Sequence, residues 1–242
     1  MGTVLNILED ARKDSKTLVA VLADPDYYDP LTFNELIDKV NRFADFLFIG
    51  GSHCLTDESE AMLNEAKNKC IKPLVLFPGP GHIISPKADA LLYLSLISGR
   101  NPEMLIGWHV HNAYKLKTSG IEIISTGYIL IDGGKPTSVS YVSNTVPIPA
   151  EKNGLIISTA IAGELMGHRL IYLEAGSGAL YPVAANTIKK VRENTNVPLI
   201  VGGGIKTPKQ AKDAAQSGAT LIVIGNALEK DIDLLKQIKE SI

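Results

Sequence analysis

The amino-acid sequence predicts an α/β fold, a (β/α)8 TIM barrel that forms a single domain over residues 1–242. Short apolar runs recur along the whole chain, and each ends in a turn rich in glycine, proline, serine or aspartate. Continuous apolar runs are typical of parallel strands that are buried on both faces. Most of the intervening segments have apolar residues at helical spacing, and no linker divides the chain. Strands alternating with helices over this length are the pattern of the barrel.

The expected strands follow one another at short intervals. The first five are residues 17–22, 46–49, 74–77, 91–97 and 121–131, and the last three, with their glycine-rich ends, are 171–178, 198–204 and 221–226. Together they make the set of eight that a closed barrel needs.

The segments between the strands predict helices with recognisable starts. Residues 30–44 carry an apolar stripe, and Asn101 with Pro102 and Thr207 with Pro208 are typical of helix N-termini. Between Gly79 and Ala90 the chain is too short and too broken by proline and glycine for a covering helix. We therefore expect a loop in place of a regular third helix, which opens the barrel wall there.

Composition excludes several classes of protein. The net charge of -2 favours neither nucleic acid nor an anionic membrane as a partner. No apolar run reaches the roughly 20 residues needed to span a bilayer, and no signal peptide opens the chain. Cys54 and Cys70 have no disulfide-framework spacing. A reduced, cytoplasmic protein is the expectation.

Glycine-rich ends of the last strands predict a phosphate site. In such barrels the active site lies at the C-terminal strand ends, and phosphate commonly binds after strands seven and eight. Gly203, Gly204, Gly225 and Asn226 follow those strands and offer backbone N–H donors, with a helix N-terminus near Thr207. Simple tight turns are the alternative interpretation of each glycine pair.

The expected strand at 171–174 ends in a carboxylate, Glu174. A carboxylate at the end of a buried strand is costly unless it is paired or used. Glu174 is therefore the expected general base or hydroxyl-positioning group. Tyr172 lies two residues earlier, on the same face of the strand, and is its expected catalytic partner.

Asp24 and Ser52 follow the first two strands and are the candidate metal ligands. Mg²⁺ takes oxygen ligands and usually shares them with substrate phosphates. The sequence of residues 24–26, Asp-Pro-Asp, also fits an ordinary turn. His109 and His111 do not share a helix face, so they predict a structural or surface role rather than a metal pair.

Several motifs together resemble the geranylgeranylglyceryl phosphate synthase family, which includes the PcrB-type proteins, over essentially the whole chain. These motifs are Leu22-Ala-Asp-Pro-Asp26, Gly50-Gly-Ser52, Leu76-Phe-Pro-Gly79, Leu94-Ser-Leu-Ile-Ser-Gly-Arg-Asn-Pro102, Ser125-Thr-Gly-Tyr-Ile-Leu130, Tyr172-Leu-Glu-Ala-Gly-Ser-Gly178, Val201-Gly-Gly-Gly-Ile205 and Gly225-Asn226. The versions at 95–101 and 174–178 are similar to the family's second group. The family's missing third helix matches the short segment after Gly79.

The resemblance implies a prenyltransferase of ether lipid biosynthesis. Such an enzyme joins a geranylgeranyl (C20) diphosphate to the 3-hydroxyl of sn-glycerol 1-phosphate and releases diphosphate. Asp24 and Ser52 would then bind the Mg²⁺ that holds the diphosphate. The implied glycerol 1-phosphate site comprises Tyr172, Leu173, Glu174, Ala175, Gly176, Ser177, Gly178, Gly203, Gly204, Gly225 and Asn226.

The prenyl tail needs an apolar groove, and the strands beside the missing helix offer Leu92 and Leu94. The family often has an aromatic residue where Met104 stands, and methionine yields more readily, so a tail longer than C20 stays open. Tyr27 and Tyr28 stand where the family often has a lysine, which leaves one diphosphate contact open. The family also suggests a homo-oligomer, a dimer or hexamer, and release of the product implies transient contact with a membrane surface.

Other classes remain as alternatives. A sugar-phosphate isomerase or a flavin-dependent oxidase would share the phosphate-binding barrel, but neither readily explains an Asp24/Ser52 metal pair or the missing helix. A non-catalytic barrel that only binds phosphometabolites would not need Glu174.

Overall fold

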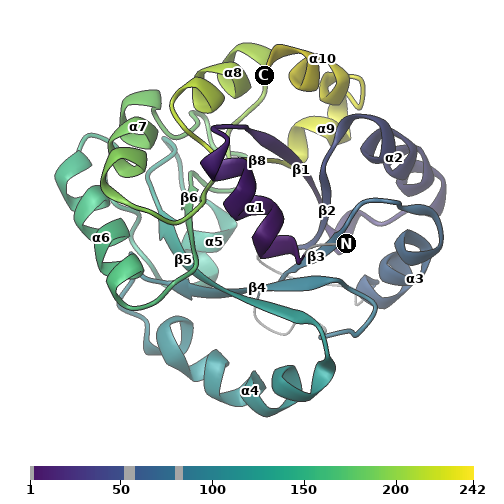
Figure 1. Ribbon diagram of the computed structural model, residues 1–242, viewed down its shortest axis with the longest axis horizontal. Helices are drawn as coiled ribbons and strands as arrows, with labels where there is room; N and C mark the ends of the chain where they lie inside the picture. Colours follow the sequence, from purple (N-terminus) through teal and green to yellow (C-terminus); the bar gives the residue numbers. More distant parts are fainter. Residues whose placement is uncertain (1–2, 52–57, 80–83) are drawn as a thin grey trace.

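The computed structural model describes residues 3–51, 58–79 and 84–242, and within them eight parallel strands close into a barrel in chain order (Figure 1). The strands are β1 (Leu18–Ala23), β2 (Phe46–Gly50), β3 (Leu74–Phe77), β4 (Ala90–Leu96), β5 (Glu122–Leu130), β6 (Leu170–Glu174), β7 (Leu199–Gly202) and β8 (Leu221–Ile224). The ring closes where β8 pairs with β1, with Leu221 opposite Leu18. The predicted TIM barrel is confirmed.

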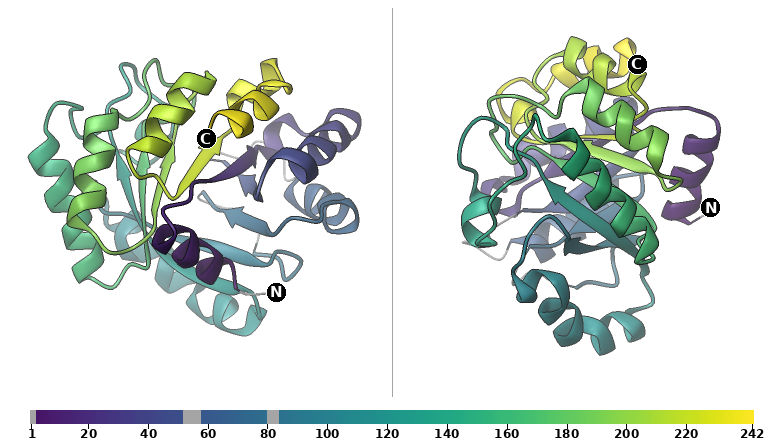
Figure 2. Two further views of the ribbon diagram at one scale, coloured as in Figure 1. Left: turned by 45° about the horizontal axis from the view of Figure 1, so that its top comes forward. Right: turned by 90° about the vertical axis from the view of Figure 1, so that its left-hand side faces the viewer.

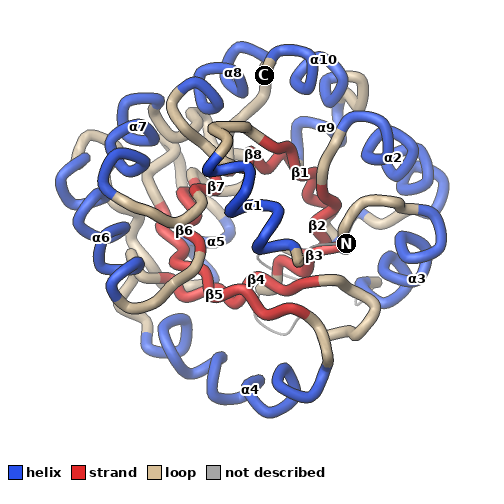
Figure 3. Tube along the Cα trace, in the orientation of Figure 1, coloured by secondary structure: helices blue, strands red, loops and turns tan. Residues whose placement is uncertain are grey.

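Helices surround this ring of strands, as Figure 3 shows. The α-helices are α1 (Val4–Lys13), α2 (Pro30–Phe43), α3 (Ser59–Lys69), α4 (Trp108–Ser119), α5 (Ser138–Val142), α6 (Asn153–Leu165), α7 (Ala185–Asn194), α8 (Pro208–Gln216), α9 (Asn226–Lys230) and α10 (Leu234–Ser241). A 3₁₀ turn, η1 (Pro25–Tyr27), follows β1, and a π-helical turn, η2 (Glu103–Gly107), leads into α4. Among all the residues that the structure describes, no helix is long and apolar enough to cross a membrane.

Strand side chains alternate between an inner and an outer apolar core. On β2, Phe46 and Phe48 belong to the core inside the barrel, whereas Leu47 and Ile49 pack in the layer between strands and helices. Because both faces are covered by apolar groups, the strands read as continuous apolar runs rather than as an alternating pattern.

Helix α1 covers the N-terminal end of the barrel (Figure 1, and the right-hand view of Figure 2). Its Val4 and Leu8 join the inner core. The carboxylate of Glu122, the first residue of β5, accepts hydrogen bonds from Val4 N at 2.6 Å and Leu5 N at 3.2 Å. These contacts satisfy N–H groups that a helix start otherwise leaves unpaired. The closed end places the site at the other end of the barrel.

The connection from β3 to β4 is a loop in the residues that the structure describes there, 78–79 and 84–89. This agrees with the loop that was predicted in place of a helix between β3 and β4, the third covering helix of a regular barrel; the helix labelled α3 is a different one, between β2 and β3. Residues 80–83 lie outside the description. The next helix, α4, stands over β4 and β5, and the views leave the strip between α3 and α4 without a covering helix among the described residues (Figures 1 and 3).

Candidate active site

The C-terminal ends of β6, β7 and β8 surround a polar cavity of about 200 Å³ at the open mouth of the barrel. Six residues of the predicted glycerol 1-phosphate set line it from the loops after these strands: Ser177, Gly178, Gly203, Gly204, Gly225 and Asn226. A hydrogen bond from Ser177 Oγ to Asn226 Oδ1, 2.6 Å long, ties the loop after β6 to the start of α9. The structure therefore brings these predicted residues together around one cavity.

Glu174 ends β6 and also lines this cavity, although only 6% of the residue is exposed. Its Oε1 accepts a hydrogen bond of 2.6 Å from Gly176 N, and the Tyr172 hydroxyl donates a second one. Burial raises the pKa of Glu174 to about 7, because these two bonds only partly offset the cost of a buried charge. A carboxyl group with a pKa near neutrality is suited to general base catalysis.

The glycines at the end of β7 leave the space that the side chains of Glu174 and Tyr172 occupy. A Cβ atom at Gly202 would lie 2.3 Å from the Tyr172 hydroxyl, and one at Gly203 would lie 2.2 Å from Glu174 Oε1. Gly203 also has a φ of +78°, a conformation that residues with a side chain rarely adopt. Glycine is thus required at this strand end for two reasons: a side chain there would collide with Glu174 or Tyr172, and the backbone forms part of the cavity wall.

Three members of the predicted binding set do not line the cavity. The side chains of Leu173 and Ala175 belong to the outer core, and Gly176, in the loop after β6, is buried against Thr137. Strand alternation explains Leu173, which points away from the barrel axis while its neighbours Tyr172 and Glu174 point inward. Any contact of Leu173 or Ala175 with a ligand in the cavity would involve the backbone.

Asp24 lies across the mouth from Glu174 and lines the same cavity. Its Oδ1 accepts a hydrogen bond of 3.1 Å from Asp26 N, and its Oδ2 lies only 2.8 Å from where a Cβ at Gly51 would be. The carboxylate therefore sits directly over the end of β2. Ser52, the second predicted metal ligand, lies outside the described residues.

The residues around Asp24 fit a hard cation in part. Burial, and in smaller measure the charge of Asp24, raise the pKa of Glu229 on α9, which indicates a concentration of negative charge at this edge. Among the described residues, however, no group of three or more acidic, histidine or cysteine side chains could hold a metal by itself. This donor set suits Mg²⁺, which usually takes one or two carboxylates together with substrate phosphates.

A second, apolar cavity of about 350 Å³ opens from the mouth and runs between β4 and α4. Phe77, Tyr128 and Val139 line both cavities, so the two adjoin. Leu94, Met104 and other apolar side chains form its wall: Leu91, Tyr93, Leu96, Trp108 and Leu116. The expectation for Leu92 was wrong: it is fully buried in the inner core, whereas Leu94 and Leu96, further along the same side of β4, line the groove.

Aromatic side chains at the junction of the two cavities were missed in the sequence. The ring of Tyr128 lies 5.1 Å from that of Tyr172, and the ring of Phe77 lies 5.5 Å from Tyr172. The alternation of inner and outer positions along residues 121–131 could have placed Tyr128 inside the barrel. Its proximity to Tyr172 depends on strand pairing, which brings residues far apart in the chain together.

The histidines do not form a metal pair. His109 is buried in the wall of the apolar cavity, where its Nε2 lies 3.0 Å from Ser95 Oγ, whereas His111 is exposed. Burial lowers the pKa of His109, which keeps its ring neutral at pH 7. The contact with Ser95 agrees with the structural role predicted for His109, which stays a prediction. His53, His82 and Cys54 lie outside the described residues.

Fold and site together define a TIM-barrel protein in which a polar cavity with a buried acid adjoins an apolar groove. Comparison with known families agrees with this class. The chain belongs to the PcrB family, whose model matches residues 13–242.

Relatives resemble the chain over nearly its full length. The geranylgeranylglyceryl phosphate synthase of Chitinophaga pinensis is 44% identical and covers 99% of this chain and 95% of its own. The enzyme of the same name from Korarchaeum cryptofilum is 35% identical over 98% of this chain and 97% of its own. A crystal structure of (S)-3-O-geranylgeranylglyceryl phosphate synthase from Thermoplasma acidophilum, in complex with its substrate sn-glycerol-1-phosphate, has a TM-score of 0.94 and 33% identity, with 100% and 99% of the chains covered.

Proposed function

We propose that the protein is a prenyltransferase that joins a geranylgeranyl group to the 3-hydroxyl of sn-glycerol 1-phosphate. One observation carries the proposal: a polar cavity with a buried acid adjoins an apolar groove, with Tyr128 and Phe77 in the wall of both. A phosphorylated alcohol fits the first cavity and a hydrocarbon tail fits the second. The names of the relatives and the bound substrate of the Thermoplasma enzyme support the same reaction.

The reaction exchanges one carbon–oxygen bond for another. The bond between C1 of the prenyl chain and the diphosphate oxygen breaks, and the 3-hydroxyl oxygen of glycerol 1-phosphate bonds to C1. Glu174 takes the hydroxyl proton, and the diphosphate leaves with the bonding electron pair. Tyr172 orients the Glu174 carboxylate through its hydroxyl. The backbone N–H groups at Gly203, Gly204 and Asn226 bind the phosphate of the acceptor.

On the other side of the mouth, Asp24 and Ser52 hold Mg²⁺ in this proposal. When bound, the ion neutralises charge on the departing diphosphate. The support is the oxygen-donor chemistry of the two residues and the close approach of Asp24 to Gly51.

Further parts of the proposal concern the surroundings of the reaction. A cytoplasmic location agrees with the free, half-buried thiol of Cys70.

The outer surface of η2 and α4 exposes an apolar stripe. Its residues, each four positions after the last, are Ile106, Val110 and Tyr114. Such a stripe suits either transient contact with a membrane surface or a second copy in a dimer or hexamer. Analytical ultracentrifugation and sedimentation with phosphatidylglycerol-containing vesicles distinguish the two.

The direct test uses purified protein, Mg²⁺, radiolabelled sn-glycerol 1-phosphate and prenyl diphosphates of graded length. We expect organic-extractable product that is most abundant with the C20 donor. Absence of extractable product at every length would overturn the proposal. A phosphosugar converted without prenyl donor would indicate an isomerase instead, and a yellow protein with bound flavin would indicate an oxidase.

A further inference from the structure

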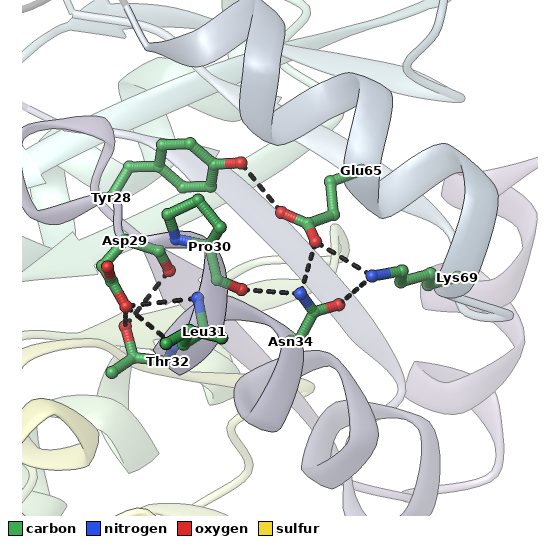
Figure 4. A network of polar contacts seen from close by, with 8 residues as sticks. All are labelled: Tyr28, Asp29, Pro30, Leu31, Thr32, Asn34, Glu65 and Lys69. Atoms are coloured by element: carbon green, nitrogen blue, oxygen red, sulfur yellow. Dashed lines mark hydrogen bonds and ion pairs between the residues drawn. The ribbon is translucent and has the colours of Figure 1, made fainter.

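Four polar side chains form a connected cluster beside the Asp24 edge of the mouth (Figure 4). Tyr28 follows η1, Asn34 belongs to α2, and Glu65 and Lys69 belong to α3. We call these residues the Tyr28 cluster. They join three segments that are separate in the sequence.

Glu65 is the centre of the Tyr28 cluster. Its Oε2 accepts a hydrogen bond of 2.8 Å from the Tyr28 hydroxyl, and its Oε1 accepts one of 3.0 Å from Lys69 Nζ. Asn34 Nδ2 donates to the same Oε1 and to the carbonyl of Pro30. These bonds, with that to Lys69 first, lower the pKa of Glu65, so the carboxylate stays ionised and remains an acceptor at neutral pH.

Tyr28 is rigidly connected to Asp24 through η1. Asp24 is the N-cap of this 3₁₀ turn and Tyr28 is its C-cap, with Tyr28 N donating to the carbonyl of Pro25 at 3.2 Å. The Tyr28 ring packs edge-on against Phe33 at 5.5 Å. A turn held at both ends by such contacts fixes the direction in which Asp24 points.

The Tyr28 hydroxyl is already used as a donor to Glu65, and burial, with this bond, raises its pKa to about 12. Tyr28 therefore stays neutral and does not replace the positive charge of a lysine at the diphosphate. Its neighbour Tyr27 is exposed and faces the cavity mouth. The two tyrosines thus have different surroundings and different roles.

We propose that Tyr28 and Glu65 are positioning residues that hold η1 against α3 and thereby aim the Asp24 carboxylate at the diphosphate-bound cation. This inference rests on the metal site of the proposed function and deepens it. A positioned ligand loses less entropy when the cation binds, so its support contributes to metal affinity without touching the metal.

The test measures the affinity of the protein for Mn²⁺ in the presence of inorganic diphosphate, by isothermal titration calorimetry. Asp24→Asn serves as the reference for a lost ligand. We expect Tyr28→Phe to weaken Mn²⁺ binding about three- to tenfold. Removing a hydrogen bond that directly supports a metal ligand usually costs about ten- to a hundredfold in affinity, and Tyr28 supports Asp24 only through η1. The Tyr28→Phe variant keeps the ring that packs on Phe33, so it is expected to fold.

Lys69→Met is the matched control. It removes the ion pair of Glu65 at the solvent side of the cluster but leaves the Tyr28–Glu65 bond in place. We expect its Mn²⁺ affinity to stay within about twofold of wild type, because Glu65 still accepts hydrogen bonds from Tyr28 and Asn34 when this pair with the half-exposed Lys69 is lost. Equal weakening in Lys69→Met and Tyr28→Phe would show a general loss of packing and would overturn the inference.

Two further variants test the role of the acceptor. Glu65→Ala should weaken Mn²⁺ binding as Tyr28→Phe does, whereas Glu65→Gln keeps an oxygen acceptor for Tyr28 but turns its NH2 toward the donors of Asn34 and Lys69, and should retain part of the affinity. In prenyl transfer assays the KM for glycerol 1-phosphate should be unchanged in both, since the glycines proposed to bind its phosphate, Gly203 and Gly204, lie on the loop after β7 and not on η1.

The outcomes separate the inference from its premise. If Asp24→Asn weakens Mn²⁺ binding and Tyr28→Phe does not, the positioning role is wrong and the metal site stands. If Asp24→Asn binds as wild type does, the metal site is wrong and the inference falls with it. The prenyl transfer assay then decides independently whether the proposed reaction survives.

Discussion

Glu174 is subject to two opposing influences on its charge. Burial disfavours the carboxylate, while the N–H of Gly176 and the hydroxyl of Tyr172 favour it. Burial is the larger effect, and the pKa rises to about 7. Near neutral pH the group is therefore partly ionised, so it can take the hydroxyl proton as the oxygen bonds to carbon and release that proton to solvent afterwards.

The pH profile of the reaction tests this role. Because the base must be ionised, kcat/KM should rise with pH up to about 7 and then level off, and should fall about tenfold per pH unit below that value. Glu174→Gln should lower kcat by about 10²- to 10⁴-fold and abolish this acid limb. Steady-state assays between pH 5 and 9 measure both, and an unchanged acid limb in Glu174→Gln would assign it to another group.

The raised pKa of Glu174 also predicts that the stability of the fold decreases as the pH rises, whereas kcat/KM increases. A raised pKa in the folded state means that folding favours the protonated acid, so this contribution is complete below the unfolded pKa near 4.5 and is lost as the pH rises through about 7. At pH 8 Glu174→Gln should therefore be more stable than wild type, by about 3 kcal/mol at most. Urea unfolding measures it, with the exposed Glu151→Gln as a control that should change little.

Gly203 provides a steric test of the same acid. In Gly203→Ala the new methyl group would meet Glu174 Oε1 and strain the positive φ, so the KM for glycerol 1-phosphate should rise by at least about tenfold. Gly154 in α6 has open space where a Cβ would lie. Gly154→Ala should leave the KM unchanged and stabilise the protein by about 0.5–1 kcal/mol. Equal KM values in the two variants would contradict the crowding seen at Gly203.

At the scale of elements, the capping of α1 by Glu122 predicts a local loss of stability. Glu122→Ala would leave the N–H groups of Val4 and Leu5 without their carboxylate, at a cost of about 1–2 kcal/mol. The urea midpoint should fall with little change in slope, while the KM for glycerol 1-phosphate stays constant because α1 closes the opposite end of the barrel. A raised KM would mean that the N-terminal end influences the mouth.

The strands were predictable because each of them is buried on both faces and ends at a glycine or polar turn. The cavity after β6, β7 and β8 was predictable for the same reason, since parallel strands bring their C-terminal ends to one edge. Leu92 was misplaced because a continuous apolar run does not show how far along the strand the groove reaches: Leu94 and Leu96, on the same inner side of β4, line it and Leu92 does not. The Tyr28–Glu65 bond was not foreseen because it joins residues 37 positions apart on different elements.

At the scale of the whole molecule, the missing helix and the active site are parts of one arrangement. A complete ring of helices would cover the strip beside β4 where the apolar groove runs. With a loop there, the groove extends from Phe77 and Tyr128 at the mouth to Leu116 on α4. A long hydrocarbon chain then has an apolar path that begins at the reacting end and leaves the polar cavity free for the acceptor.

Donor length should therefore depend on how far that path is open, and Met104 in its wall is the residue to change. Met104→Trp narrows the groove and should exclude the distal part of long donors. Each buried carbon contributes about 0.8 kcal/mol, so losing one five-carbon unit costs about 3–4 kcal/mol, or at least about a hundredfold in kcat/KM.

A donor short enough to end before Met104 should react as in wild type, and Met104→Ala should improve donors longer than C20. The exposed Met166→Ala is the control for loss of a methionine away from the groove. Competition assays with mixed donors measure the ratios directly. An equal loss for all lengths in Met104→Trp would mean that Met104 affects the reacting end, and the groove would then not set the length of the chain.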